Sequence, residues 1–305
     1  MKSPLTGLDS CSIIRTLDAL SIAKRWRNEM NISWAPPASV EKILYCKDPV
    51  TGLHFYSPSE IAGGAYLYSQ LQRFPWYYMH NKWEFDLALE LLKSTGPRIL
   101  EVGVGNGAFL AKAKDVGLHV SGIELNPDGA RAAKDKGFNI IEKDMTFLLA
   151  EDASTWDSIC AFQVLEHLAQ PRKFLDEAIS LLRPGGLLVL SVPNAAVARK
   201  LDPYHNNLLD QPPHHMSHWD EGVFRSLEFL LPLKLRNVMF ETLSSYHVNW
   251  FVDSWSQQLH SKYGQFAGRL LLNRVTMPIV KMILYLGVRK LIRGHTMMVC
   301  FEKLG

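Results

Sequence analysis

A regular alternation of strand-like and helix-like segments between residues 97 and 192 constrains the fold more than any other feature. Short apolar runs that predict strands are followed, five times, by segments with turn or helix start and stop signals. We expect strands at 99–102, 119–123, 138–141, 156–162 and 187–192, and helices at 108–116, 127–136 and 171–182. This order predicts the α/β class, with a doubly wound, open and mostly parallel sheet that carries helices on both faces.

The segments on either side of this core follow other patterns. Apolar residues recur at helical spacing up to about residue 40, and aromatic side chains are dense between residues 45 and 80. The elements expected behind the core are a loop at 196–220, a helix at 221–231, a strand at 239–247, a helical stretch at 270–293 that Pro278 kinks, and a last strand at 296–301. We therefore expect an N-terminal helical and aromatic cap at 1–90 and a core at 91–195. The region 196–305 adds a substrate loop, the remaining strands, one of them antiparallel, and a basic C-terminal helix.

The charge and the cysteines exclude several classes of protein. A formal net charge of +3 is too small to indicate a nucleic-acid partner. Between Asp253 and Glu302 the chain has seven basic residues and no acidic one, so the C-terminal helix either touches a membrane surface or packs with its charges outward, and Pro278 favours packing. The four cysteines are far apart, and we find no signal peptide and no run long enough to span a membrane, so we expect a cytoplasmic protein.

Glycines and a carboxylate follow the first two expected strands. Gly103, Gly105 and Gly107 predict a sharp turn at which the backbone approaches a ligand closely. Glu124 ends the second strand about 20 residues later, where a carboxylate accepts hydrogen bonds from the two hydroxyls of a ribose. NAD and S-adenosylmethionine both carry such a ribose. Because Gly103-x-Gly105-x-x-Ala108 satisfies the relaxed dinucleotide fingerprint, an NAD-dependent reductase is one alternative.

Asp144 and Met145 follow the third expected strand. A carboxylate there can accept a hydrogen bond from an adenine amino group, with Met145 against the ring. The alternatives are that Asp144 caps a helix and that Glu124 lies solvated on the surface. A non-catalytic binding module of the same fold is a further alternative, although such a module has no need to keep Glu101 and the glycines.

Five motifs stand in register along the core: Glu101–Gly107, Gly122–Glu124, Phe162–His167, Leu181–Gly186 and Ser191–Asn194. Together they resemble the class I S-adenosylmethionine-dependent methyltransferases of the small-molecule type, which have a Rossmann-like fold. The flanking segments 52–58, 71–78, 82–85 and 212–219 resemble bacterial methyltransferases associated with cell-surface glycan genes. The resemblance implies S-adenosyl-L-methionine as cofactor and O-methylation of a small polar acceptor, such as a sugar or a glycan precursor.

The same resemblance implies how the cofactor is held. Glu101 would lie near the amino group of the methionine part, and the backbone from Gly103 to Gly107 would line that part. Gln163, after the fourth strand, would lie along the cofactor, and Leu125 is a further candidate contact beside Glu124.

Three histidines are candidates for the base that takes a proton from the acceptor. His167 follows the fourth strand, and His214 and His215 lie in the loop at 196–220. Histidine titrates near neutral pH, although all three have a structural alternative as packing or capping residues. Three imidazoles within 214–218 could also bind a metal, but no nearby Asp or Glu completes a standard ligand spacing, so we expect no metal. Trp76-Tyr77-Tyr78 is either a substrate lid or a hydrophobic cap.

Overall fold

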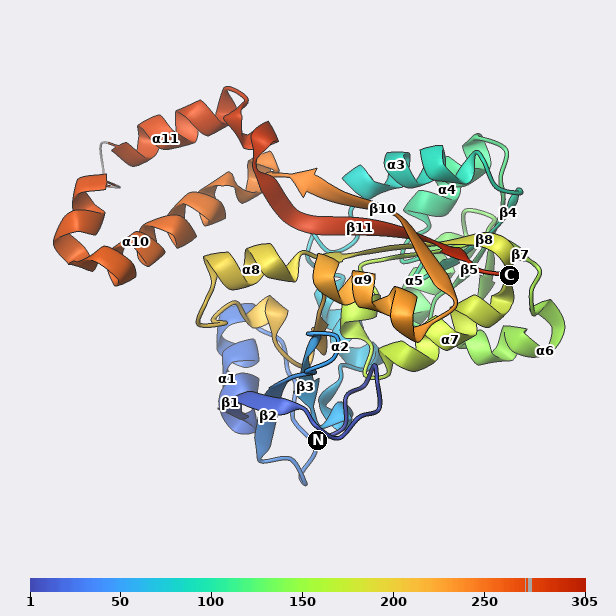
Figure 1. The fold of residues 1–305 in the computed structure, drawn as a ribbon, viewed down its shortest axis with the longest axis horizontal. Coiled ribbons are helices and arrows are strands. Elements are labelled where there is room, and N and C mark those ends of the chain that lie inside the picture. The colour runs from blue at the N-terminus through green and yellow to red at the C-terminus, as the bar shows by residue number, and fades with distance from the viewer. Residues whose placement is uncertain (272, 274–275) are drawn as a thin grey trace.

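The computed structural model describes residues 1–271, 273 and 276–305, and its centre is a seven-stranded sheet of order β10-β11-β8-β7-β4-β5-β6 (Figure 1). The five expected core strands are present as β4 (Arg98–Val102), β5 (His119–Ile123), β6 (Asn139–Ile141), β7 (Trp156–Phe162) and β8 (Leu182–Pro193). These five strands pair in parallel. The chain then adds β10 (Leu233–Thr242) and β11 (Arg293–Lys303), and β11 runs antiparallel to both β8 and β10. The expected fold class is therefore confirmed.

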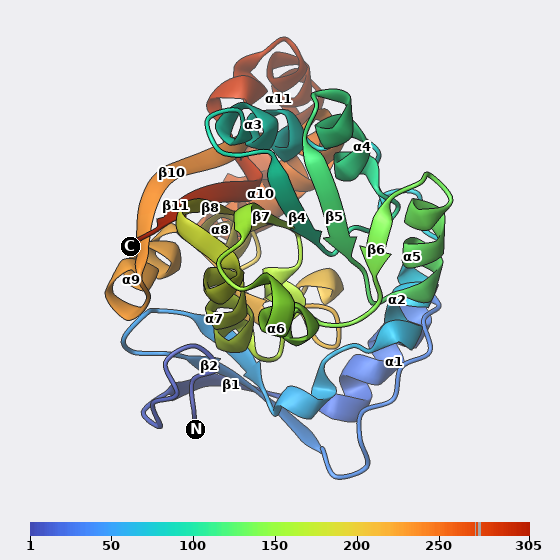
Figure 2. The same ribbon diagram turned by 90° about the vertical axis from the view of Figure 1, so that its right-hand side faces the viewer.

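Alternating side chains on the strands bury both faces of this sheet. Leu100 on β4 packs in the cluster that contains helices α7 (Pro171–Leu181) and α9 (Glu221–Leu230), whereas its neighbour Ile99 packs with α3 (Trp83–Leu92) and α4 (Ala108–Asp115). Successive strand residues point to opposite faces, so near-continuous apolar runs are what a sheet with two covered faces requires. Figure 2 shows the two helical layers on either side of the sheet.

Local start signals fix the helices that lead away from the carboxyl ends of the strands. Helix α5 (Pro127–Lys134) begins as expected, with Pro127 at its first position and the Asn126 side chain accepting from the amide of Asp128. Short helical turns follow the next two strands: η2 (Met145–Leu148) with α6 (Leu149–Asp152), and η3 (Leu165–His167).

The N-terminal region forms a second, smaller sheet of order β1-β2-β3-β9. The expectation of a helix at residues 12–18 is wrong, because they form strand β1 (Ser12–Asp18) and the helix α1 (Ala19–Met30) starts only after Asp18 caps it. The apolar spacing is misleading because Ile13 and Ile14 are exposed rather than buried. The remaining elements of this region are β2 (Lys42–Lys47), β3 (His54–Ser57), η1 (Ser59–Ile61) and α2 (Ala65–Leu71).

The loop at 196–220 is more ordered than its sequence suggests. It contains α8 (Ala195–Leu201), η4 (Leu208–Asp210) and the two-residue strand β9 (Ser217–His218), which pairs with β3. The loop therefore completes the N-terminal sheet, whereas α3 packs against the central one. The division at residues 90 and 195 stays a prediction, but contacts join these parts across both boundaries.

A helical hairpin projects from the body between β10 and β11 (Figure 1). After η5 (Ser245–His247) it consists of α10 (Val248–Leu271), α11 (Thr276–Tyr285) and η6 (Val288–Leu291). Pro278 lies in the first turn of α11, where a proline is tolerated, so the expected kink is wrong. The expected packing also fails at Leu286 and Leu291, which are 79% and 88% exposed. The side chains of Leu270 and Leu271 lie outside the described residues.

No helix among the described residues is both long and apolar enough to cross a membrane.

Trp26 ties the N-terminal sheet to the loop that follows the core. Its ring is fully buried, and its indole Nε1 donates to the carbonyl of Pro212 at 2.8 Å. We expect Trp26→Ala to lower the free energy of unfolding by about 3–5 kcal/mol, the cost of emptying a large buried site. Leu20→Ala on the same helix removes a side chain that is 62% exposed and is the matched control. Equal denaturation midpoints for the two variants would contradict this account.

Candidate functional site

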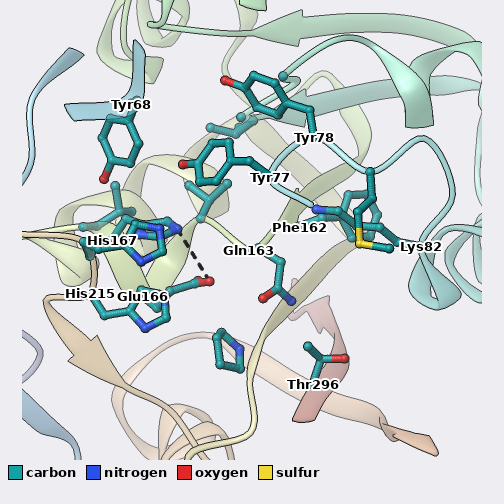
Figure 3. Close-up of a pocket in the computed structure, with 18 of the residues that line it drawn as sticks. Tyr68, Tyr77, Tyr78, Lys82, Phe162, Gln163, Glu166, His167, His215 and Thr296 are labelled. Carbon is teal, nitrogen blue, oxygen red and sulfur yellow. Dashed lines mark hydrogen bonds and ion pairs between the residues drawn. The ribbon is translucent and has the colours of Figure 1, made fainter. Parts of the chain in front are cut away.

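A cavity of about 1400 Å³ opens at the carboxyl ends of β4, β5 and β7. Ligands in open α/β sheets bind at this edge. The cavity exceeds the roughly 300–1,000 Å³ of a site for one drug-sized ligand, so it has room for two molecules side by side. Aromatic residues from the N-terminal region, among them Tyr68, Tyr77 and Tyr78, cover one side of it, as Figure 3 shows.

Glu124 lies at the end of β5 with its carboxylate held by the neighbouring backbone. Oε2 accepts from the amide of Gly105 and Oε1 accepts from the amide of Asn126, both at 2.7 Å. Burial raises the pKa of Glu124, although these amide hydrogen bonds oppose the shift. Glu124 also lines the cavity, so its carboxylate is fixed in place where it can accept from a ligand.

Glu101, at the end of β4, presents an unsatisfied carboxylate to the same cavity. Its Oε2 is buried and has no hydrogen-bond partner among the described residues. Burial raises the pKa of Glu101 well above its usual range, and Lys82 at the cavity wall opposes the shift. A buried acceptor without a donor is unfavourable, so this position favours a ligand that brings an N–H group.

The glycine turn after β4 forms part of the cavity wall. Gly105 has φ +55°, and a Cβ added there would lie 2.9 Å from the ring of Tyr78. Gly107 lies outside the lining of the cavity. It instead caps α4 at φ +78°, and a Cβ added at this position would lie 3.1 Å from the ring of Phe138, so this glycine serves the turn.

The other expected cofactor contacts line the cavity at the same end. Leu125 is exposed beside Glu124, and Met145 is buried. Asp144 lies on the rim, with Oδ2 3.8 Å from the ammonium of Lys173. Its side chain makes no capping hydrogen bond to η2, so the alternative of a helix cap is not realised. Gly103 completes this part of the lining.

Gln163 points into the middle of the cavity (Figure 3). It follows β7 with φ +59°, an uncommon conformation for a residue with a side chain. Its Nε2 donates to the hydroxyl of Ser191 at 3.2 Å, and that hydroxyl donates to Oε1 of the buried Glu84 at the same distance. Gln163 is thus held by a chain of polar contacts that crosses β8.

The three candidate histidines meet at the other end of the cavity. The ring of His214 lies 4.5 Å from the rings of both His167 and His215, measured between ring centres. His167 follows β7, whereas the other two lie about 47 residues later in the chain. The main chain joins the two segments, because the amide of Met216 donates to the carbonyl of Glu166 at 2.7 Å.

Burial keeps two of these imidazoles neutral. Burial, together with the neighbouring His215, lowers the pKa of His167 to about 3. The pKa of His214 is lowered well below its usual value, again chiefly by burial. Both rings are therefore unprotonated near neutral pH and offer a nitrogen lone pair.

Glu166 lies in the motif Phe162–His167, but the sequence does not single it out as a site residue. Its side chain is buried, and Figure 3 shows the carboxylate directed into the cavity. Oε1 lies 3.8 Å from Nε2 of His167. Neither oxygen has a hydrogen-bond partner in the part of the chain that the structure describes. Burial raises the pKa of Glu166 to about 7. Its place directly after an expected strand was the available signal.

The fourth histidine of the loop has a structural role. His218 is buried in β9, where its Nδ1 meets the hydroxyl of Tyr45 and its Nε2 meets the carbonyl of Asp210, both at 2.8 Å. Polar residues from β10, β11 and the segment between them add a further wall that the sequence did not indicate: Glu241, His247, His295 and Thr296.

The comparisons with known proteins agree with this geometry. Residues 76–227 match the family described as a methyltransferase domain. A ubiquinone biosynthesis O-methyltransferase from Xylella fastidiosa is 32% identical over 124 residues, which cover 39% of this chain and 50% of that protein. The enzyme of the same description from Xanthomonas axonopodis is 31% identical over 113 residues, 35% of this chain and 47% of that protein. The chain therefore matches about half the length of these curated relatives.

Among solved structures, a methyltransferase from Archaeoglobus fulgidus that depends on S-adenosylmethionine has a TM-score of 0.42 and 18% sequence identity. The match covers 72% of this chain and 94% of that one. The sequence matches over residues 76–227 and the geometry of the site together support a class I S-adenosylmethionine-dependent methyltransferase. S-adenosyl-L-methionine is the cofactor of this class.

The residues at the glycine end of the cavity fit this cofactor. The unsatisfied Oε2 of Glu101 suits a positively charged amino group, and the fixed carboxylate of Glu124 suits two ribose hydroxyls. Met145 supplies an apolar contact for a base.

We expect Glu124→Ala to weaken binding of S-adenosylhomocysteine by about 1.5–3 kcal/mol, because it removes hydrogen bonds to a charged acceptor. Calorimetric titration measures this loss as a rise in Kd of about 10- to 100-fold. Glu142→Ala, which removes an exposed carboxylate just after β6, is the control and should keep the wild-type affinity. An unchanged Kd in Glu124→Ala would place the ribose elsewhere.

Proposed function

We propose that this chain transfers a methyl group from S-adenosylmethionine to a hydroxyl oxygen of a small polar acceptor. The observation that carries the proposal is the arrangement of the cavity, with ligand-binding carboxylates at one end and Glu166 among three histidines at the other. The matches to O-methyltransferases support oxygen as the atom that is methylated. The methyltransferase family match favours this function over an NAD-dependent reductase.

The cofactor supplies a methyl group that its positively charged sulfur already activates. The protein therefore has to align the acceptor oxygen with that methyl group and keep water out. Gln163 lies between the two ends of the cavity and is held from behind, which suits a positioning role. Tyr77 and its aromatic neighbours cover the opening and support the lid interpretation of this segment.

The hydroxyl of the acceptor has to lose its proton as the oxygen attacks. Glu166 is our candidate for the group that accepts this proton, because its carboxylate is directed into the cavity and carries no competing hydrogen bond in the described structure. His167, His214 and His215 then surround the acceptor oxygen. The bond from carbon to sulfur breaks as the new carbon–oxygen bond forms, and its electron pair stays on sulfur.

Two chemical classes of acceptor fit this end. The flanking segments, which resemble methyltransferases associated with glycan genes, favour a sugar hydroxyl. The sugar ring can stack on Tyr68 and Tyr77, and its other hydroxyls can bond to Glu241 and Thr296. The named relatives favour a hydroxyl on an aromatic ring, and the same aromatic wall suits that group. A sugar is our first choice, because the wall opposite the aromatic residues is polar.

We expect methyl transfer to at least one hydroxyl compound in a panel of nucleotide sugars, glycan fragments and hydroxylated aromatic acids. Glu166→Gln should lower kcat by about 100-fold or more, because it removes the proton acceptor while keeping the shape of the side chain. The affinity for S-adenosylhomocysteine should stay at the wild-type value in this variant. Radiolabelled methyl transfer and calorimetry are the measurements.

The matched control is Glu90→Gln, which changes an exposed carboxylate on α3 that lies outside the lining of the cavity. If no acceptor is methylated although the cofactor analogue binds tightly, the proposed reaction is wrong. If Glu166→Gln turns over at the wild-type rate, the proton goes to another group.

We also propose that the C-terminal hairpin contacts an anionic membrane surface. Seven apolar side chains on and between α11 and η6 are exposed: Ile279, Met282, Ile283, Tyr285, Leu286, Val288 and Leu291. Lys281, Arg289 and Lys290 lie among them, with Lys281 3.7 Å from Asp253 on α10, and the sequence from 254 to 301 contains no acidic residue. This combination of apolar and positive groups suits the interface of a bilayer with negative lipids. The proposal keeps the catalytic body in the cytoplasm, with an acceptor that is carried on or near the membrane.

The double change Leu286→Ser and Leu291→Ser should lower binding to phosphatidylserine-containing vesicles by about 100-fold or more, since each buried leucine contributes roughly 1.5–3 kcal/mol. Phe229→Ser is the control, because Phe229 is 89% exposed but lies on α9, away from the hairpin. Sedimentation with vesicles measures both. Equal binding of all three proteins, or none by the wild type, would overturn the membrane contact.

A further inference from the structure

We propose that His167, His214 and His215 form a binding site for a divalent transition-metal ion of the zinc type. Each ring offers one ligand nitrogen, and the three nitrogens lie within 4.8 Å of one another. Tetrahedral zinc, with Zn–N distances of about 2.0–2.1 Å, holds its ligand nitrogens roughly 3.4 Å apart. Metal binding at that spacing requires the rings to move closer together wherever their nitrogens are separated by up to 4.8 Å.

The hydrogen bonds of the three rings fix which nitrogen stays free. Nδ1 of His167 lies 2.7 Å from the carbonyl of His214, and Nδ1 of His214 lies 2.8 Å from the carbonyl of Leu209. A carbonyl only accepts, so both Nδ1 atoms carry the proton and both Nε2 atoms keep their lone pairs. The Nε2 of His214 is buried and has no partner in residues 1–271, 273 and 276–305.

His215 follows the same rule with a carboxylate in place of a carbonyl. Its Nδ1 lies 3.3 Å from Oδ1 of Asp210. Asp210 itself is buried and fixed by Nδ2 of Asn207, which donates to its Oδ2 at 2.9 Å. Metal-binding histidines regularly direct their second nitrogen to a carboxylate or a backbone carbonyl in this way. All three rings therefore carry the outer contacts of a ligand before any ion is present.

The charge around the cluster favours a cation. The buried carboxylate of Glu166 lies 3.8 Å from Nε2 of His167 and has no hydrogen-bond partner among the described residues. Leaving a buried carboxylate without a positive group or donor is costly. The long basic side chain of Lys82 lies across the cavity from the histidines in Figure 3. An ion among the three rings would neutralise Glu166 directly.

No metal is expected from the sequence, because the ligand spacing is not standard along the chain. The structure supplies the missing ligand from a separate segment, since His167 comes from the turn after β7 and the other two come from the loop after α8. Three imidazoles with an open position suit zinc, cobalt or a similar ion better than magnesium, which prefers oxygen ligands. The open position faces the cavity, where a hydroxyl of an acceptor would bind to the ion and lose its proton to Glu166 more readily.

Metal binding can be measured without the methyl donor and without the acceptor, so the test is independent of the proposed methyl transfer. The full-length protein is treated with chelator, dialysed against ZnCl2 or CoCl2, and freed of unbound ion by gel filtration. We expect one ion per chain by mass spectrometry and, with cobalt, the intense visible absorption of a four-coordinate site. We also expect a rise in Tm when ZnCl2 is added, because an ion that binds the folded chain stabilises it.

His214→Ala should weaken the affinity by more than about 100-fold, since even a change to an outer contact costs about 10- to 100-fold. Asp210→Asn tests such an outer contact and should lower the affinity by about 10- to 100-fold. His119→Ala, at an exposed position on β5, is the control and should bind as the wild type does. Circular dichroism establishes that each variant is folded.

Wild-type protein that retains no ion and shows no cobalt absorption overturns the site whatever the variants do. Equal metal content in wild type and folded His214→Ala overturns it as well, because the ion would then bind elsewhere. If His214→Ala does not fold, Asp210→Asn decides the question through the affinity that titration with ZnCl2 measures. A wild-type affinity in Asp210→Asn then counts against the site.

Discussion

Three carboxylates without full solvation at one edge of the parallel sheet are the constraint on which the site depends. Glu101 lies near the end of β4, Glu124 directly follows β5, and Glu166 lies in η3 after β7; each is buried. Backbone donors offset the free-energy cost of this burial at Glu124. The described residues supply no such donor to Oε2 of Glu101 or to the two carboxylate oxygens of Glu166, so the cost is not offset there. These two carboxylates therefore mark the positions at which a ligand with a positive group or a donor gains most.

The acceptor end is built from segments far apart in the chain, and its geometry depends on how they are joined. Strand β9 pairs with β3, Trp26 holds the carbonyl of Pro212, and the amide of Gly63 donates to the carbonyl of Pro213 at 2.8 Å. The N-terminal sheet is thus a frame for the histidine loop as well as a cover for the cavity. A change in that frame would alter the acceptor end first and leave the glycine turn in place.

The sequence predicted the central sheet because its strands are defined locally. Strand β4 ends at the glycine turn and β5 ends at the capped helix α5, so pattern and structure agree closely from β4 to β7, whereas β8 begins at Leu182, before the expected start at 187. The sequence-based prediction failed at β1, because Ile13 and Ile14 fit the spacing of a buried helical face although both are exposed. The candidate cofactor residues could be selected from the sequence because each stands at or just after the end of a strand. Glu166 and the contact of His167 with the distant loop could not, because sequence spacing does not show which segments meet in space.

The two ends of the cavity differ in how they are built: local sequence defines one end, and contacts between distant segments define the other. This difference suits a fold that accepts different substrates. The cofactor end is made by turns whose shape β4 and β5 dictate, so it tolerates little change in residue type. The proposed acceptor end depends on the position of Glu166 in η3, after β7, at the edge of the sheet to which we assign the cofactor. The loop that supplies His214 and His215 adds no strand to the central sheet, since its strand β9 pairs with β3 instead. What chemistry the acceptor end performs is therefore decided by a contact between η3 and that loop.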